Sequence, residues 1–151
     1  LDPKHRAYYY ARARRYQKQL APLNKTIAQA KHGVDPQRNV VLVSEPVFDY
    51  ALDNLGYRIA NQRFAKAVED DNDPSPKEIA AMQSAIRQRR VAFFVNNKQE
   101  SNSTIKNMLK LARQYDVPVL NVTETKPDHQ TYTEWMQTQY QQLIKIQEQG
   151  E

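Results

Sequence analysis

The sequence predicts an α/β fold: a four-stranded parallel sheet in the order 2-1-3-4, with helices on both faces and a long helix in front. Strand-like and helix-like segments alternate along the chain, which is typical of parallel sheets with right-handed crossovers. The segment Val40–Val43 is apolar at every position. Such a run indicates a strand that is buried on both sides, as in a parallel sheet.

The composition indicates a single globular domain and excludes several classes of protein. The 151 residues correspond to about one domain, and the 40% hydrophobic and 26% charged residues are ordinary for a globular protein. No run approaches the roughly 18 apolar residues that indicate a membrane helix. The chain has no cysteine, which excludes disulfides, thiolate metal sites and cysteine nucleophiles. Because it opens without methionine, we expect an excised or processed piece.

Positive charge is concentrated near the N-terminus. Residues 1–38 contain nine Lys or Arg and two Asp, a net charge of +7, whereas the remainder holds thirteen against fifteen, a net charge of −2. A basic patch of this kind suits a nucleic acid or an anionic membrane. The alternative is the solvated face of a long helix, which must be polar in any exposed helix. We favour this alternative and expect no nucleic-acid partner.

The first element is a helix over residues 4–31, because apolar residues recur at steps of three and four. Asp2 and Pro3 suit its start and Gly33 its end, whereas Pro22 predicts a kink or a break. It would be about 40 Å long, more than one small lobe needs, so we expect part of it to pack on something absent from the chain. Its apolar stripe comprises Tyr9, Ala13, Tyr16, Leu20, Leu23, Ile27 and Ala30.

Apolar runs predict the other strands, and apolar residues at steps of three and four predict the other helices. Ser75, Pro76 and Glu78 form the signature of a capped helix start. We expect residues 1–33 to form a linker helix and residues 34–151 a single α/β lobe. Strands are predicted at Val40–Val43, 57–60, 91–95 and 117–122. Helices are predicted at 47–55, with Pro46 in its first turn, at 76–90, at 103–115, and from 132, with Tyr132, Met136, Tyr140 and Leu143 facing inward. Loops are predicted at 64–73, which is rich in acidic residues, and at 123–130.

Candidate site residues gather where strands end. In open parallel sheets, ligands bind at the carboxyl ends of the strands where the strand order reverses. Glu45 follows the first strand and Asn96 ends the third, so both are expected to line one crevice, which Glu124 can reach from the end of the fourth. Asp128 and His129 add oxygen and nitrogen donors of the kind that bind metal ions. The alternative for Glu45 is a carboxylate that meets backbone N–H groups at a helix start.

Catalytic patterns are missing from the sequence. Ser44 lacks the flanking glycines of a nucleophile elbow, and no nucleophile is accompanied by a base and an orienting group. His5 and His32 flank the long helix and are expected to be exposed. A receiver domain is excluded because no acidic pair flanks the first strand. The chain has only three glycines, too far apart to cradle a phosphate, so a nucleotide-binding domain is disfavoured. We predict that the chain is not an enzyme.

Several motifs, in order, resemble the substrate-binding proteins of zinc and manganese ABC transporters, a family that includes lipoprotein adhesins. The similarity covers the full length and corresponds to the long linker helix and the C-terminal lobe of these two-lobed proteins. The motifs are LDP at 1–3 with Tyr16 and Leu20, SEPVFDY at 44–50, DPSP at 73–76 with Ile79, FFVN at 93–96, TET at 123–125, and QTY at 130–132 with Met136.

The resemblance implies metal-ligand positions at Glu45, Asn96 and Glu124. All three are substituted, since zinc-type members carry His, Glu and Asp there. It implies Zn or Mn as the transported ligand, held between two lobes of which the N-terminal one is absent here, and an ABC permease as partner. It also implies a location at the extracellular face of the membrane or in the periplasm, with a lipid anchor on the missing N-terminal part. The alternative is a degenerate member that binds no metal and acts as a surface interaction or adhesion protein.

Overall fold

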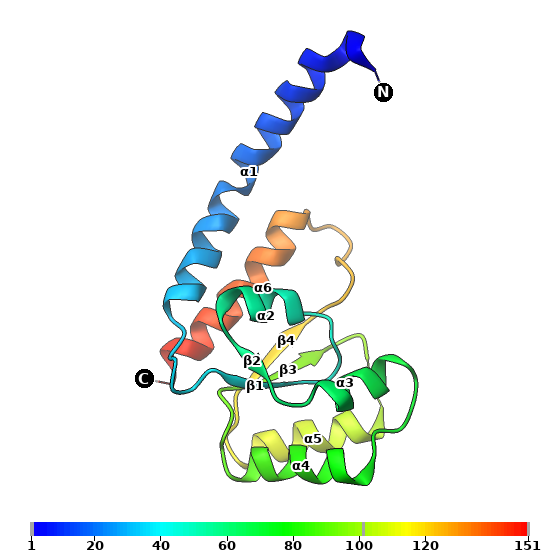
Figure 1. Ribbon diagram of the computed structural model, residues 1–151. Helices are drawn as coiled ribbons and strands as arrows, with labels where there is room; N and C mark the ends of the chain where they lie inside the picture. The colour runs from blue at the N-terminus through cyan, green and yellow to red at the C-terminus, as the bar shows by residue number, and fades with distance from the viewer. Residues whose placement is uncertain (1, 101, 151) are drawn as a thin grey trace.

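The computed structural model describes residues 2–100 and 102–150 and confirms the α/β fold (Figure 1). Its four strands are all parallel and follow the predicted order β2-β1-β3-β4. The elements in chain order are η1 (Pro3–His5), α1 (Arg6–His32), β1 (Val40–Val43), α2 (Asp49–Leu55), β2 (Arg58–Ile59), α3 (Gln62–Glu69), α4 (Pro76–Arg87), β3 (Phe94–Asn97), α5 (Ser103–Gln114), β4 (Val119–Val122) and α6 (Tyr132–Glu148).

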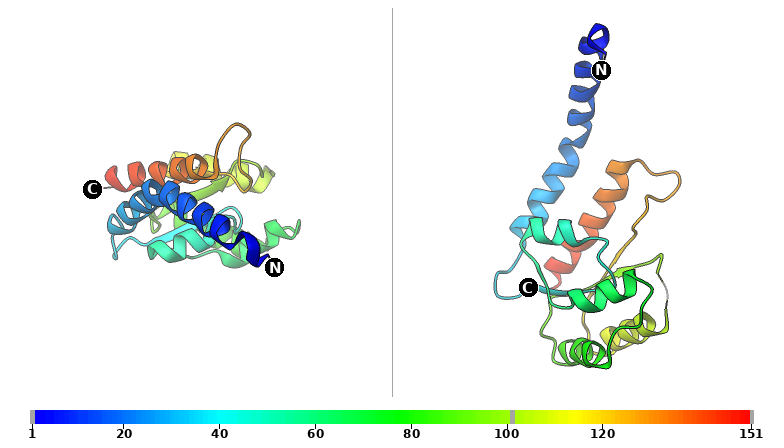
Figure 2. Two further views of the ribbon diagram at one scale, coloured as in Figure 1. Left: turned by 90° about the horizontal axis from the view of Figure 1, so that it is seen from above. Right: turned by 45° about the vertical axis from the view of Figure 1, so that its right-hand side comes forward.

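Each face of the sheet carries its own apolar core. Val41 and Val43 of β1 pack with residues of α1, α2 and α6, whereas Leu42 packs with residues of α3, α4 and α5. This division follows from the alternation of side chains along a strand. The views in Figures 1 and 2 agree that α4 and α5 lie together on one side of the sheet, with α1 and α6 on the other. β1 is therefore buried on both sides, as predicted, and β3 is buried on both sides as well.

Helix α1 extends well beyond the lobe (Figure 1). Only its C-terminal part packs on the lobe, chiefly on α6, and Tyr9 and Tyr16 in the N-terminal part of the predicted stripe are 53% and 49% exposed. Pro22 does not break the helix, because it lies on an exposed face where water can solvate the carbonyl that loses its donor. None of the helices in the described residues combines the length and the apolar character of a membrane span.

The predicted loop at 64–73 is wrong in its first part, which forms helix α3. Phe64 and Val68 are four residues apart and are 1% and 6% exposed, so they bury one face of the helix. Lys66 contacts Asp70 at 2.6 Å on the solvent side. The crowded acidic residues at its end made this short amphipathic helix resemble a loop.

Several boundaries also differ from the prediction. β3 begins and ends two or more residues later than 91–95, because its pairing with β4 continues to Asn97 opposite Val122. α2 begins at Asp49, so Pro46 lies in a bend before the helix and not in its first turn. Tyr132 is 47% exposed and does not join the inward stripe of α6. The predicted capping box of α4 is present.

Candidate functional site

The crevice between β1 and β3 brings Glu45 together with Asn97. Glu45 lies in the bend after β1 and is 9% exposed, and Asn97 is the last residue of β3 and is 1% exposed. The side-chain Nδ2 of Asn97 donates a hydrogen bond to Oε1 of Glu45. Its backbone N–H donates to Oγ of Ser44 at 2.9 Å, which ties the ends of the two strands together.

Asn96 does not share this crevice with Glu45. Successive residues of a strand point to opposite faces, so Asn96 and Asn97 lie on opposite sides of the sheet. Nδ2 of Asn96 donates to Oδ1 of Asn121 on β4 at 3.0 Å. Sequence reasoning missed Asn97 because it ended the third strand too early, and only the pairing with β4 reveals where the strand ends.

The rim of the crevice concentrates negative charge. Burial raises the pKa of Glu45, the hydrogen bond from Asn97 opposes this rise, and the carboxylates of Glu100 and Glu124 raise the pKa further. Burial also raises the pKa of Asp49, whose Oδ1 is buried and has no hydrogen-bond partner in the described parts of the chain. Within residues 2–100 and 102–150, no Lys or Arg forms an ion pair with the carboxylate of Glu45 or of Asp49.

The polar loop after β4 lies beside this rim. Two hydrogen bonds fix it to the turn after β3: Nε2 of Gln99 donates to Oγ1 of Thr125 at 2.6 Å, and the N–H of Thr125 donates to Oε1 of Gln99 at 2.9 Å. Glu124 precedes Thr125 and is exposed, yet it is close enough for its charge to act on Glu45. The loop therefore brings a second carboxylate near Glu45.

Asp128 and His129 lie further along the same loop and are exposed. His129 adopts a positive φ of 67°, in the turn that precedes α6. Among the described residues, neither side chain makes a hydrogen bond to a group of the crevice. The structure therefore places Glu45 and Glu124 near one another and leaves Asp128 and His129 at the surface.

The rim carries donors for a cation but not a complete metal site. Across the residues that the structure describes, no group of three or more His, Asp or Glu side chains is placed to hold a metal ion. Carboxylate oxygens suit hard divalent cations, and Zn²⁺ accepts them as well. The carboxylates of Glu45 and Glu124 are therefore of a donor type that such cations accept, but two carboxylates do not make a complete coordination shell.

Comparison with known proteins identifies a family. The profile described as ZnuA, "Zinc-uptake complex component A periplasmic", matches residues 1–146. No curated protein matches the chain in sequence.

Solved structures give the same fold. The periplasmic zinc binding protein TroA from Treponema pallidum superposes with a TM-score of 0.72 at 14% identity, over 96% of this chain and 54% of that one. The binding protein FpvC from Pseudomonas aeruginosa, solved in complex with Mn²⁺, superposes with a TM-score of 0.71 at 16% identity, over 99% of this chain and 55% of that one. A mutant of the periplasmic metal binding protein from Candidatus Liberibacter asiaticus, solved with Mn bound, gives 0.69 at 18% identity, over 95% and 53%.

The chain therefore spans about half the length of the solved structures that it resembles. At these identities the structural similarity shows the fold alone, whereas the sequence profile covers nearly the whole chain. The chain belongs to the family described as zinc-uptake complex component A, periplasmic.

Proposed function

We propose that this chain is the C-terminal lobe and linker helix of a solute-binding protein that captures Zn²⁺ or Mn²⁺ and delivers it to an ABC permease. In this proposal residues 1–33 form the linker and 34–151 the lobe. The protein works at the extracellular face of the membrane or in the periplasm, carries a lipid anchor on its N-terminal part, and is not an enzyme. The observation that carries the proposal is the pair of carboxylates Glu45 and Glu124 at the carboxyl ends of the parallel strands, where the charge of Glu124 adds to burial in raising the pKa of Glu45.

A divalent cation would compensate the negative charge of Glu45 and Glu124 at this rim. Buried carboxylates without a cationic partner are unfavourable, because burial penalises their charged form. Burial raises the pKa of Glu45, as do neighbouring carboxylates, and among the described residues no Lys or Arg is paired with it. Two of the structures that share the fold were solved with Mn bound.

The free half of α1 supports a two-lobed arrangement. Four tyrosines on it are each about half exposed: Tyr8, Tyr9, Tyr10 and Tyr16. Exposed apolar surface of this extent is typical of an interaction site. We assign it to the N-terminal lobe, which would supply the missing metal ligands across the cleft.

Calorimetry of the two-lobed protein tests the proposal. Zn²⁺ and Mn²⁺ are titrated into the wild type, Glu45→Gln and Glu124→Gln, with Asp53→Asn as the control because Asp53 is exposed at the far end of α2. We expect each rim variant to weaken binding by about tenfold or more, and the control to leave it unchanged. Unchanged binding in both rim variants would place the metal elsewhere. No binding by the wild type would contradict metal capture and favour the degenerate adhesion protein instead.

A further inference from the structure

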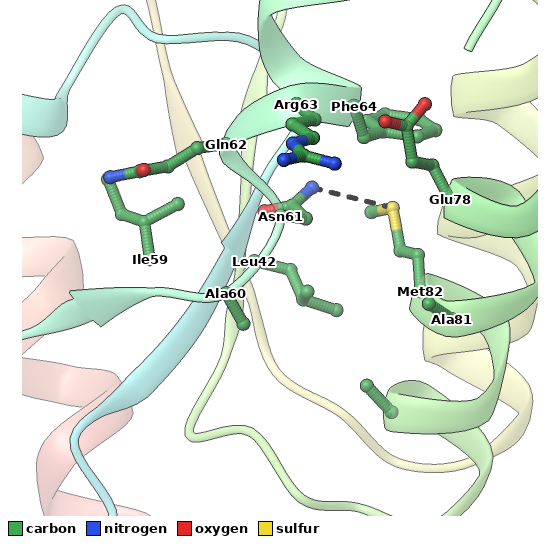
Figure 3. Close-up of a pocket in the computed structure, with 11 residues that line it drawn as sticks. Leu42, Ile59, Ala60, Asn61, Gln62, Arg63, Phe64, Glu78, Ala81 and Met82 are labelled. Atoms are coloured by element: carbon green, nitrogen blue, oxygen red, sulfur yellow. Dashed lines mark hydrogen bonds between the residues drawn. The ribbon is translucent and has the colours of Figure 1, made fainter. Parts of the chain in front are cut away.

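A hollow lies away from the rim, between β1, the start of α3 and α4 (Figure 3). Its volume is about 340 Å³, at the lower end of the range of small-molecule sites. Leu42, Phe64 and Met82 line it and are at most 2% exposed, so its walls belong to the rigid core. It shares no lining residue with the crevice of Glu45.

Small side chains keep this hollow open. Ala60, Ala81 and Ala85 line it, and a larger side chain at these positions would project into the space. Asn61 fixes one wall: its Oδ1 accepts the N–H of Val43 at 3.0 Å, and its Nδ2 donates to the carbonyl of Val43 at 2.8 Å. The same Nδ2 lies 3.6 Å from Sδ of Met82, the contact drawn in Figure 3. The cavity is therefore preformed, which lowers the entropic cost of binding.

One cation and one anion flank the mouth of the hollow (Figure 3). Arg63 is exposed, and its guanidinium forms no hydrogen bond or ion pair with any residue that the structure describes. Oε2 of Glu78 accepts hydrogen bonds from the N–H and Oγ of Ser75, both at 2.9 Å. These bonds lower the pKa of Glu78, as does the charge of Arg63, so the carboxylate stays ionised.

We propose that this hollow binds a free α-amino acid with an aliphatic side chain. The side chain fills the apolar hollow, the carboxylate faces Arg63 and the ammonium group faces Glu78. A simple fatty acid would bring its carboxylate near Glu78 without compensation, and an alkyl amine would bring its charge near Arg63. A zwitterion joined to an apolar side chain complements both charges and the space beneath them. The inference does not depend on metal binding.

An NMR titration of the intact protein with L-leucine tests the proposal. We expect saturable shifts confined to the backbone amides of residues 61–64 and 81–85. L-leucinamide lacks the carboxylate, N-acetyl-L-leucine lacks the ammonium group and glycine lacks the side chain, so each should bind about tenfold or more weakly than L-leucine. Equal binding of leucinamide or N-acetyl-leucine would overturn the pairing with Arg63 and Glu78. The absence of shifts with L-leucine at about 10 mM would overturn the site itself.

Three variants localise the binding. Ala81→Leu should fill the hollow, and because Ala81 is exposed on α4 the fold should tolerate the change. Ala80→Leu is the matched control, since Ala80 is the neighbouring exposed position and does not line the hollow. We expect Ala81→Leu and Arg63→Gln to weaken L-leucine binding by about tenfold or more, with Ala80→Leu unchanged. If Ala81→Leu bound L-leucine with wild-type affinity, or if Ala81→Leu and Ala80→Leu lost the same affinity, the assignment of the site would be overturned.

Discussion

Two neighbouring asparagines at the end of β3 are expected to respond very differently to truncation. Asn97→Ala removes the hydrogen bond to the buried carboxylate of Glu45 and the bond in which Oδ1 accepts the N–H of Gln99 at 3.0 Å. A hydrogen bond to a charged group contributes about 1.5–3 kcal/mol and a neutral one about 1 kcal/mol. We therefore expect the free energy of unfolding to fall by about 3 kcal/mol. Asn96→Ala loses one neutral bond, to Asn121, and should cost about 1 kcal/mol.

The difference between the variants should also depend on pH. Burial raises the pKa of Glu45 above 4.5, so its contribution to stability is most favourable below 4.5 and is lost as the pH rises through the raised value. The bond from Asn97 limits that loss by favouring the ionised form. Asn97→Ala should therefore destabilise the protein more at pH 7 than at about pH 4, whereas Asn96→Ala should cost the same at both.

Urea unfolding measures both effects. The chain has one tryptophan, and Nε1 of Trp135 donates to Oγ1 of Thr123 at 2.8 Å near the rim, so its fluorescence reports on this region. A double-mutant cycle with Glu45→Gln should give coupling for Asn97 and none for Asn96. Equal losses in the two asparagine variants, or coupling of Glu45 with Asn96, would refute the assignment of their faces.

Three further predictions concern the stability of the lobe, measured by urea unfolding. Ser75→Ala should cost about 1 kcal/mol through the lost cap of α4; because capping lowers the pKa of Glu78, this loss should shrink as the pH falls through that lowered value. Leu143→Ala should lower the free energy of unfolding by about 3 kcal/mol, since Leu143 is fully buried. Tyr16→Ala, on the exposed half of α1, should lower it by less than about 0.5 kcal/mol. Similar losses in the two variants would show that this half of α1 is packed. Gly56→Ala should cost about 1 kcal/mol from its φ of 103° alone, because nothing lies within 4 Å of the added Cβ.

The strand order could be predicted because each strand carries its own local signal. Val40–Val43 is apolar on both faces and pairs in the structure with β2 on one side and β3 on the other. Chain connectivity with right-handed crossovers then leaves few arrangements. The capped start at Ser75 was equally visible, because the side-chain chemistry of a capping box is local.

The details of the site depended on distant residues and were less predictable. Whether Asn96 or Asn97 faces Glu45 is decided by where β3 ends, and that end is set by pairing with β4, some 25 residues later in the chain. A shift of one residue exchanges the faces of a strand. Likewise, the stripe of α1 continues through Tyr16 in sequence, but only contact with a neighbouring element decides whether such a stripe is buried. Helical periodicity gives the face and not the partner.

The residues that stabilise the fold are different from the carboxylates that are proposed to bind the metal. Leu143 and Ile86, one on each face of the sheet, are fully buried by residues of this chain, and Leu23 and Ala30 of α1 belong to the same core as Leu143. The carboxylate of Glu45, by contrast, has polar and negatively charged neighbours and no cationic one among the described residues. The stability of the lobe thus comes from its apolar cores, and under the proposed function a bound cation would compensate the negative charge near Glu45. Cation binding should therefore stabilise the lobe through the rim alone, and a variant such as Glu124→Gln should reduce that stabilisation without lowering the stability of the metal-free protein.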